Sequence, residues 1–353
     1  MPAGLRLPLI LTDWTSEASL ATLHARAPAV PATRSGAIDA LRVLAVVAVV
    51  TGHVWSGALI DAGLYTWHVP AFFLLSGYLW KPREPDARWA VAAEAKKRFR
   101  TIMIPYLAWL VVTLLVHIPI HIHRGTLTSE AVILPLIGGS LNAGPFGAYW
   151  FMSALFISAI MFRALERVPL VLRVALIAGI TVVIYLFGDV LAPLPFSLGV
   201  AGAALIFLLA GQALRHVRSR VKAPIRFGAV CLVAGAAPVL AGRSASLDMK
   251  YNELGTPVLS IVVAVLISCG LLLILEGVFS RLPVWVHAMS TKLAAGCLMV
   301  VLTHTYVLWL LAVPDTERSF WVLIVALVLP WAVAMFLNRT PLSRIFLGTR
   351  RAT

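Results

Sequence analysis

Long apolar runs separated by short polar segments follow one another through most of the chain. An α-helix needs about 20 predominantly apolar residues to cross the hydrocarbon core of a bilayer. The pattern predicts ten membrane-spanning segments, at residues 38–60, 67–80, 102–120, 149–165, 169–187, 195–213, 226–242, 256–276, 294–312 and 319–337. We therefore expect an all-α protein, a polytopic integral membrane bundle of about 10 transmembrane helices.

The two ends of the chain are predicted to be tails outside the bundle. Residues 1–37 are rich in Pro and Ala and lack the short apolar core and small-residue cleavage site of a signal peptide. We expect a cytoplasmic N-terminal tail at 1–37, a ten-helix membrane domain at 38–340 and a cytoplasmic C-terminal tail at 341–353. The second predicted span, 67–80, is the shortest, so we expect it to be tilted, broken or re-entrant.

Composition supports a membrane protein and accounts for the charge. Hydrophobic residues make up 60% of the 353 residues and charged residues 12%, whereas soluble domains carry about 25% charged residues. The formal net charge of +14 would suit nucleic acid, but its distribution has another cause. With the N-terminus inside, 24 of the 29 Lys and Arg residues fall on the cytoplasmic side, and four fall outside, at Arg124, Arg243, Lys250 and Arg318.

This asymmetry follows the positive-inside rule, and the opposite orientation would reverse it. It predicts that both termini face the cytoplasm, and it accounts for the basic charge without a nucleic-acid partner. We expect a multi-pass protein of a bacterial cell membrane, inner or plasma, in contact with membrane lipids.

Two ionisable residues lie within the first predicted span. Arg42 and His53 are eleven positions apart, which on an α-helix is about three turns, so both lie on one face about 16 Å apart. Ionisable side chains inside a membrane are costly and often mark function. Arg42 is expected near the cytoplasmic surface, paired there with Asp39, and His53 in the outer half. The alternative is an Arg that reaches the lipid headgroups and a His satisfied by a neighbouring helix.

The chemistry that suits this pair is acyl transfer from a cytoplasmic donor. An Arg binds phosphate through paired hydrogen bonds, and a His can remove the proton from an attacking hydroxyl. Coenzyme A carries phosphates at one end and a thioester at the other, joined by an arm comparable in length to the Arg42–His53 gap. One acyl-CoA molecule could therefore contact both residues.

Several motifs in order resemble one known family. Asp39-Ala-Leu-Arg42, followed after ten residues by His53, resembles the Arg-x10-His signature of the acyltransferase family 3 membrane enzymes. Further segments similar to that family lie at 68–78 (HVPAFFLLSGY), 96–106 (KKRFRTIMIPY), 149–155 (YWFMSAL) and 302–304 (LTH). The matches extend over about residues 36–310.

The resemblance implies O-acylation of an extracytoplasmic carbohydrate or glycolipid, such as a lipid-linked glycan, with acyl-CoA as donor and acetyl-CoA as the first expectation. It implies that His53 is the catalytic His and that Arg42 binds the donor. Lys97-x-x-Arg100 replaces the Arg-x-x-Arg that is common in the family. The chain also has no fused periplasmic hydrolase-like domain, so the membrane unit is expected to complete the transfer alone.

On the donor side, five further residues are candidates. Lys97, Arg98 and Arg100 would meet the donor phosphates at the inner surface, although any cytoplasmic loop beside a span is expected to be basic. The hydroxyls of Ser76 and Tyr78 would line the path of the thioester. The alternative for Ser76-Gly77-Tyr78 is a notch of small residues that lets two helices approach.

On the acceptor side, the candidates are His68, Trp150 and His304. His68 lies at the outer end of the second span. Trp150 beside Tyr149 has an interfacial anchor as its alternative, and His304, near the middle of the ninth span, has a packing role as its alternative. Glu276 is expected to be solvated at the cytoplasmic end of the eighth span.

No metal site is expected. Cys231, Cys269 and Cys297 lie in or beside apolar spans, with neither disulfide nor zinc spacing. The nearby histidines form a weak metal signal and are interpreted as an interfacial cluster, at His117, His121 and His123.

Three questions stay open from the sequence. His53 can act as a general base for direct transfer or carry the acyl group itself. The oxyanion donor can be Ser76, Tyr78 or a backbone N–H. Buried Arg and His also mark transport pathways, so a transporter or flippase for a lipid-linked glycan is the alternative function, although no duplicated halves are visible.

Overall fold

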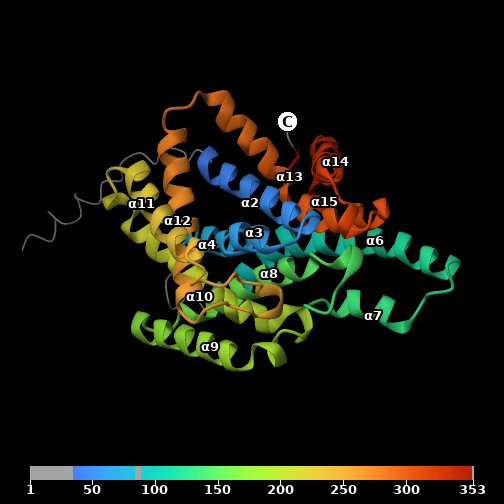
Figure 1. Cartoon of the computed structure of the whole chain (residues 1–353), viewed down its shortest axis with the longest axis horizontal. Helices are drawn as coiled ribbons and strands as arrows, with labels where there is room; N and C mark the ends of the chain where they lie inside the picture. The colour runs from blue at the N-terminus through green and yellow to red at the C-terminus, as the bar shows by residue number, and fades with distance from the viewer. Residues whose placement is uncertain (1–34, 84–88, 352–353) are drawn as a thin grey trace, which may run out of the picture. The chain divides into compact units, whose positions relative to one another are not determined.

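The structure, a computed structural model, describes residues 35–83 and 89–351. The predicted N-terminal tail therefore lies almost entirely outside the described residues. The described chain is helical, and its β-structure is one isolated bridge between Asp248 and Glu253. The α-helices are α2 (Gly36–Val54), α3 (Ala58–Ile60), α4 (His68–Tyr78), α5 (Ala90–Arg98), α6 (Ile104–His123), α7 (Ser129–Ile137), α8 (Tyr149–Leu165), α9 (Leu170–Leu191), α10 (Leu198–Val217), α11 (Pro224–Leu240), α12 (Leu259–Phe279), α13 (Val284–Leu311), α14 (Phe320–Asn338) and α15 (Ser343–Phe346) (Figure 1).

Short helical segments of other types connect them. Two are π-helical, η1 (Asp61–Tyr65) and η2 (Phe99–Met103). The rest are 3₁₀-helical, η3 (Gly144–Phe146), η4 (Pro195–Ser197), η5 (Arg218–Arg220), η6 (Met249–Tyr251) and η7 (Asp315–Glu317).

Nine helical stretches of the described chain are long and apolar enough to cross a membrane, and α11 is a shorter apolar helix. These ten elements match the ten predicted spans in order. The predicted all-α, polytopic membrane bundle is therefore confirmed, and the protein is a multi-pass membrane protein.

The boundary between the first two spans differs from the prediction. The first helix ends at Val54 instead of residue 60, and Gly57 follows with φ +127°. Glycine adopts this conformation at little cost because it has no Cβ. The second span then begins at Ala58 and runs to Tyr78 through the π-helical turn η1. The predicted second span, 67–80, was therefore too short, and the π-helical turn lies before its predicted start.

The third span is also longer than predicted. It runs without a break from Ala90 to His123, through the π-helical turn η2 just before Pro105. Proline has no N–H to donate to the preceding turn, and a π-helical turn accommodates the missing bond. The basic residues 96–100 are consequently part of this helix, and α5 packs against α8.

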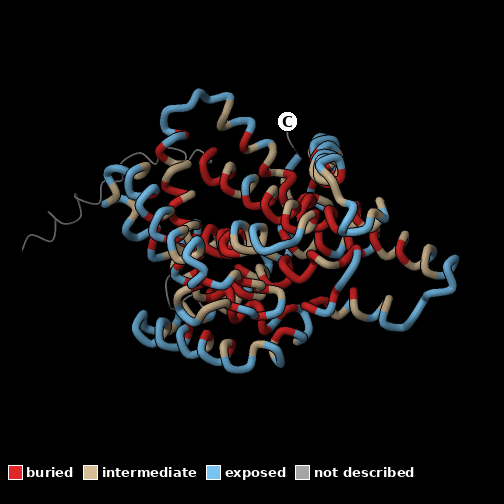
Figure 2. The backbone as a smooth tube through the Cα atoms, in the orientation of Figure 1, coloured by how far each residue is buried: buried red, intermediate tan, exposed pale blue. Residues whose placement is uncertain are grey.

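The interior of the bundle is built by close helix pairs. α2 packs on α13, and α4 packs on α10. A Cβ on Gly77 would come within 2.0 Å of the Leu208 carbonyl oxygen, and one on Gly211 within 1.9 Å of the Leu74 carbonyl oxygen. Such approach requires glycine, so the close-packing interpretation of the Ser-Gly-Tyr segment is confirmed for Gly77. The buried residues concentrate along these helices (Figure 2).

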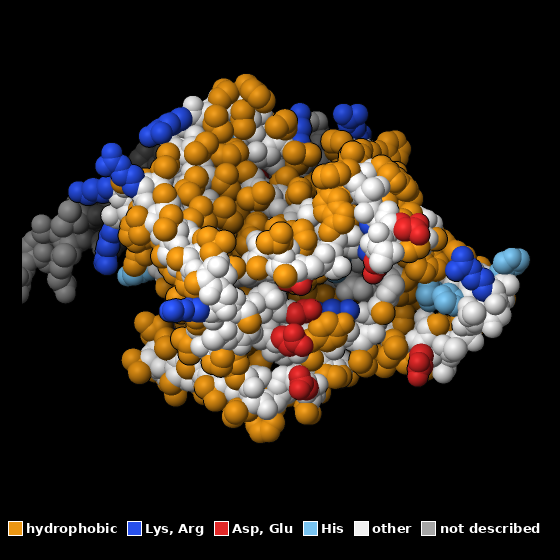
Figure 3. Space-filling view, viewed as in Figure 1, with side chains coloured by type: hydrophobic (Ala, Val, Ile, Leu, Met, Phe, Trp, Pro, Cys, Tyr) orange, Lys and Arg blue, Asp and Glu red, His pale blue; other side chains and the backbone are white. Residues whose placement is uncertain are grey.

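α9 is apolar apart from charged residues near its two ends, but it is buried on one narrow stripe only. Its buried residues are Ile177, Thr181 and Ile184, which recur at helical spacing. Many of the other apolar side chains of α9 are exposed, and hydrophobic side chains gather along the lower edge of the view in Figure 3, where α9 lies. A helix that exposes this much apolar surface is suited to face lipid.

Successive spans alternate in direction, which gives the bundle two ends. We call the end with Arg42 the Arg42 end; there Gly36 of α2 lies against His287 of α13. We call the opposite end the His53 end; there Arg318, just before α14, contacts His53.

Candidate active site

A basic cavity of about 450 Å³ opens at the Arg42 end, between α2, α4, α5 and α8. Its Lys and Arg lining residues are Arg42, Lys81, Arg83, Lys97, Arg98 and Arg163. Glu94 is the acidic residue of its lining. Cations that line a cleft of low dielectric produce a strong positive potential, which suits a polyanion.

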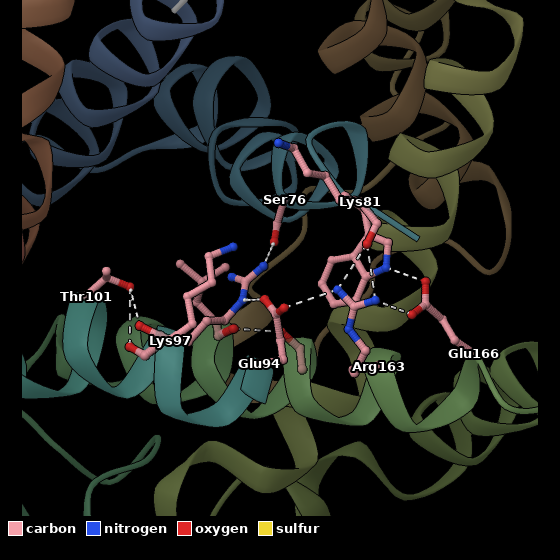
Figure 4. A network of polar contacts seen from close by, with 11 residues as sticks. Ser76, Lys81, Glu94, Lys97, Thr101, Arg163 and Glu166 are labelled. Atoms are coloured by element: carbon pink, nitrogen blue, oxygen red, sulfur yellow. Dashed lines mark hydrogen bonds and ion pairs between the residues drawn. The ribbon is translucent and has the colours of Figure 1, made fainter. Parts of the chain in front are cut away.

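The wall of this cavity is held by a network around Glu94 (Figure 4). Glu94 is 2% exposed and pairs with Arg98 at 2.8 Å and with Arg163 at 3.1 Å. Arg163 also pairs with Glu166 and donates to the Lys81 carbonyl oxygen. A buried charge needs such partners to offset its desolvation, and here the pairs tie α5, α8 and the segment after α4 together.

Ser76 is joined to this network. The Nη2 of Arg98 donates to the Ser76 hydroxyl at 3.1 Å, between α5 and α4. Lys97, on the same turn as Arg98, also lines the cavity. Three of the predicted donor-side residues, Ser76, Lys97 and Arg98, therefore meet Arg42 in one cavity.

Arg42 is held by Asp39. Its Nη1 pairs with Asp39 Oδ1 at 2.8 Å, so the predicted pairing is confirmed. Asp39 was expected at the surface, and this was wrong, because the carboxylate is fully buried and accepts a hydrogen bond from Thr291 at 3.0 Å. α13 begins ten residues before the predicted span and covers Asp39. The Arg42 side chain remains 31% exposed, within reach of a ligand.

Tyr78 and Arg100 lie elsewhere. The Tyr78 hydroxyl donates to Glu276 at 2.7 Å, and Glu276 also pairs with Arg218. Glu276 was expected to be solvated, but its side chain is only 14% exposed and takes part in this ion pair and in the hydrogen bond from Tyr78. Arg100 is exposed and is not part of the basic cavity.

A second cavity, of about 220 Å³, lies at the His53 end. His53, His68 and Trp150 line it together, from α2, α4 and α8. Trp150 was given an interfacial anchor as its alternative, but it is 7% exposed and faces this cavity. His68 is buried, and its Nδ1 lies 2.5 Å from the Leu64 carbonyl oxygen.

His304 stacks on His53. The two rings have centroids 4.9 Å apart and planes 23° apart. The Nδ1 of His304 donates to the Val300 carbonyl oxygen at 3.0 Å, while its Nε2 is buried without a hydrogen-bond partner among the described residues. α13 therefore presents a fixed imidazole against the face of His53.

A third cavity, of about 340 Å³, shares His53 with the second one. Lys250 and Arg318 also line it. Arg318 donates to the His53 carbonyl oxygen at 2.6 Å, and the Trp55 indole donates to the Arg318 carbonyl oxygen at 3.2 Å. These bonds tie the end of α2 to the segment before α14.

Lys250 and Arg318 were not predicted as site residues. From the sequence they were named only as two of the four basic residues expected on the side opposite the cytoplasm. A cation expected on the same side of the membrane as His53 was the signal that could have identified them. Lys250 lies in η6 and donates to the Asn142 carbonyl oxygen at 2.7 Å. Burial lowers the pKa of Lys250, and burial raises the pKa of Asp248, which lines the second cavity together with it.

Phe72 lies between the two ends. It lines both the basic cavity and the second cavity, which contains His53. Its ring lies against Phe151 of α8, with centroids 5.1 Å apart. Ser76 is one turn from Phe72 towards the Arg42 end, and His68 is one turn away towards the His53 end. A single aromatic side chain is thus common to the two cavities.

The described part of the chain shows no candidate metal site. No group of three or more His, Cys, Asp or Glu residues is arranged there to hold a metal ion.

The bundle thus combines helices of membrane length with a basic cavity at one end and a histidine-lined cavity at the other, an arrangement that suits a membrane enzyme. A family model described as an acyltransferase domain, that of acyltransferase family 3, matches residues 35–338. The chain therefore belongs to this family, as its motifs indicated, and it is an acyltransferase with an acyl donor and an acceptor. No curated protein and no solved structure matches the chain.

Proposed function

We propose that the protein transfers an acyl group from acyl-CoA at the Arg42 end to a hydroxyl of a carbohydrate or glycolipid at the His53 end. Acetyl is the first candidate for this acyl group. The observation that carries this proposal is the pair of cavities along one helix, α2. One is lined by six cations, the other contains His53, and Phe72 lines both.

The basic cavity suits the phosphates of coenzyme A. Arg42, Lys97 and Arg98 offer N–H donors to phosphate oxygens, which form short charge-assisted hydrogen bonds with such groups. Asp39 orients the Arg42 guanidinium, and Glu94 orients that of Arg98. In the predicted orientation this cavity faces the cytoplasm, where acyl-CoA is made.

The acyl-bearing arm then extends past Phe72. Arg42 and His53 are about 16 Å apart along the helix, a distance that the arm can span. The thioester is placed beside His53, and the Phe72–Phe151 contact encloses the arm.

His53 removes the proton from the acceptor hydroxyl, and the oxygen attacks the thioester carbonyl. The C–O bond forms, the C–S bond breaks, and the thiolate of coenzyme A leaves with the proton from the His53 imidazolium. Ser76 and Tyr78 lie at the Arg42 end, so they are unsuited as oxyanion donors. The Lys250 ammonium lines the same cavity as His53 and is proposed for that role.

Family membership favours acyl transfer over the alternative of a transporter or flippase. The test uses purified protein, [¹⁴C]acetyl-CoA and a glycolipid extract from the membranes of the source cells. We expect His53→Ala to reduce transfer by at least about 100-fold, because a general base contributes about 10²–10⁴-fold. The matched control, His123→Ala, alters an exposed histidine of α6 and should leave transfer unchanged.

Full activity of His53→Ala would contradict the proposed mechanism. The absence of acetyl transfer by the wild type to any component of the extract would contradict the proposed donor or acceptor.

A further inference from the structure

A fourth cavity, of about 380 Å³, lies beside the His53 end between α6, α7 and the segment before α8. Trp309, Ala143 and Gly144 line it, and the same three residues line the third cavity, which contains His53. The two cavities are therefore neighbours, with Trp309 of α13 at their common wall.

Polar atoms are buried in this fourth cavity without partners in the described chain. Asn142 is 2% exposed, and neither its amide oxygen nor its amide nitrogen has a hydrogen-bond partner there. His117 is 6% exposed, and the same holds for its Nδ1. Buried polar groups are nearly always hydrogen-bonded. An amide and an imidazole that line a cavity with unused donors and acceptors indicate a ligand rich in hydroxyl groups.

Aromatic rings surround these groups. The Trp309 ring centroid is 5.4 Å from that of His117 and 6.5 Å from that of His121, whose plane is parallel to within 8°. Trp309 is half-buried. A flat, partly exposed indole beside polar groups is the surface on which the C–H face of a sugar ring packs, with its hydroxyls hydrogen-bonded around it.

The lining disfavours two other ligand chemistries. Among the described residues, no Lys or Arg lines this cavity, in contrast to the basic cavity, so a phosphate would lack a counter-charge. A fatty acyl chain would leave Asn142 and His117 unsatisfied, which is costly for buried polar groups. Thr126, Thr128 and Glu130 add further polar groups to the wall.

We propose that this cavity is a subsite for a neutral sugar residue of the acceptor, bound next to the residue that is acylated at His53. Trp309 provides the packing surface, and Asn142 and His117 bind hydroxyls. The inference rests on the proposed function for its place in the reaction, but the binding of a sugar can be measured without transfer.

The test is saturation-transfer NMR, which detects weak binding, on the full chain in lipid nanodiscs free of sugar detergents. The probes are methyl glycosides of glucose, galactose, mannose and N-acetylglucosamine. We expect saturation of at least one glycoside by the wild type, and at least about a fivefold weaker signal for Trp309→Ala and Asn142→Ala, because each substitution removes a group that contacts the sugar. Trp285→Ala is the matched control, because Trp285 is an exposed tryptophan at the other end of α13.

Trp309→Phe keeps an aromatic face and should retain part of the signal, which tests the site if Trp309→Ala unfolds. Absence of signal for every glycoside in the wild type, or a signal that Trp309 and Asn142 variants leave unchanged, overturns the subsite. His53→Ala should bind glycosides normally. If it does, and the wild type transfers no acetyl group, the proposed function fails while the subsite stands.

Discussion

The imidazole ring of His304 lies against that of His53, with centroids 4.9 Å apart. α2 and α13 pack along each other and set this contact. Because the Nδ1 of His304 is bonded to the Val300 carbonyl oxygen, its ring cannot rotate freely. His304 therefore limits the orientations open to His53, and we propose a positioning role for it.

This contact predicts different effects for two substitutions of His304. His304→Phe retains a ring against His53 and should keep kcat within about threefold of the wild type. His304→Ala leaves a gap beside His53 and should lower kcat by about 10–100-fold, since small misplacements of a catalytic group have effects of that size. The measurement is kcat with acetyl-CoA. Equal loss of activity in both variants would show that a nitrogen of His304, and not its ring, is needed.

The side chain of Phe72, which lines both cavities, predicts the acyl length that the enzyme accepts. Phe72→Ala should raise the kcat/KM ratio of hexanoyl-CoA to acetyl-CoA by at least about tenfold, since hexanoyl carries several more methylenes than acetyl and each one bound in an apolar pocket is worth about 1 kcal/mol. Phe72→Trp should lower that ratio. Phe227→Ala, on an exposed residue of α11, is the control. An unchanged ratio in both Phe72 variants would place the acyl path elsewhere.

The spans could be predicted from the sequence because apolar runs of bilayer length rarely occur outside membrane helices. Their ends could not, because local chemistry decides them. Gly57 separates the first two helices, and the π-helical turn η2 continues the third span back to Ala90. The first ten residues of α13 include several polar side chains, so the hydropathy pattern placed the start of this span ten residues too late. These ten residues cover Asp39, and its burial was therefore not predicted.

The arrangement of the candidate residues was predictable where they lie on one helix. The register of Arg42 and His53 is set by α2 alone. Ser76 and Tyr78 are two positions apart on α4, about 200° around the helix, so they could not both face one cavity. Lys250 and Arg318 lie in the connections between spans. Their approach to His53 depends on tertiary packing, which the hydrophobic periodicity of the sequence does not predict.

The charge of Lys250 is expected to make kcat depend on pH. Burial disfavours the charged ammonium, so the pKa of Lys250 lies below the ordinary lysine value. If the cation stabilises the oxyanion, kcat falls as the pH rises through this lowered pKa. Lys250→Arg stays charged across that range, so its alkaline loss of activity should be absent. An identical alkaline limb in the wild type and in Lys250→Arg would assign the limb to another group.

Asp39 predicts an effect on donor binding. Asp39→Ala frees the Arg42 guanidinium from its buried partner, so the KM for acetyl-CoA should rise by about 5–10-fold, within the range measured for charge-assisted contacts. Arg42→Ala should raise the same KM at least as much, with kcat nearly unchanged. Arg281→Ala, on an exposed Arg before α13, is the control. A change in kcat without a change in donor KM would contradict the role of Arg42 in donor binding.

We propose that donor and acceptor reach His53 from opposite ends of the bundle. Sealed membrane vesicles from source cells test it, with [¹⁴C]acetyl-CoA added outside and label counted in the glycolipid fraction. We predict incorporation in inverted vesicles, whose cytoplasmic face meets the donor, and almost none in right-side-out vesicles until they are permeabilised. His53→Ala should abolish the signal in both. Equal incorporation in intact vesicles of both orientations would contradict the claim.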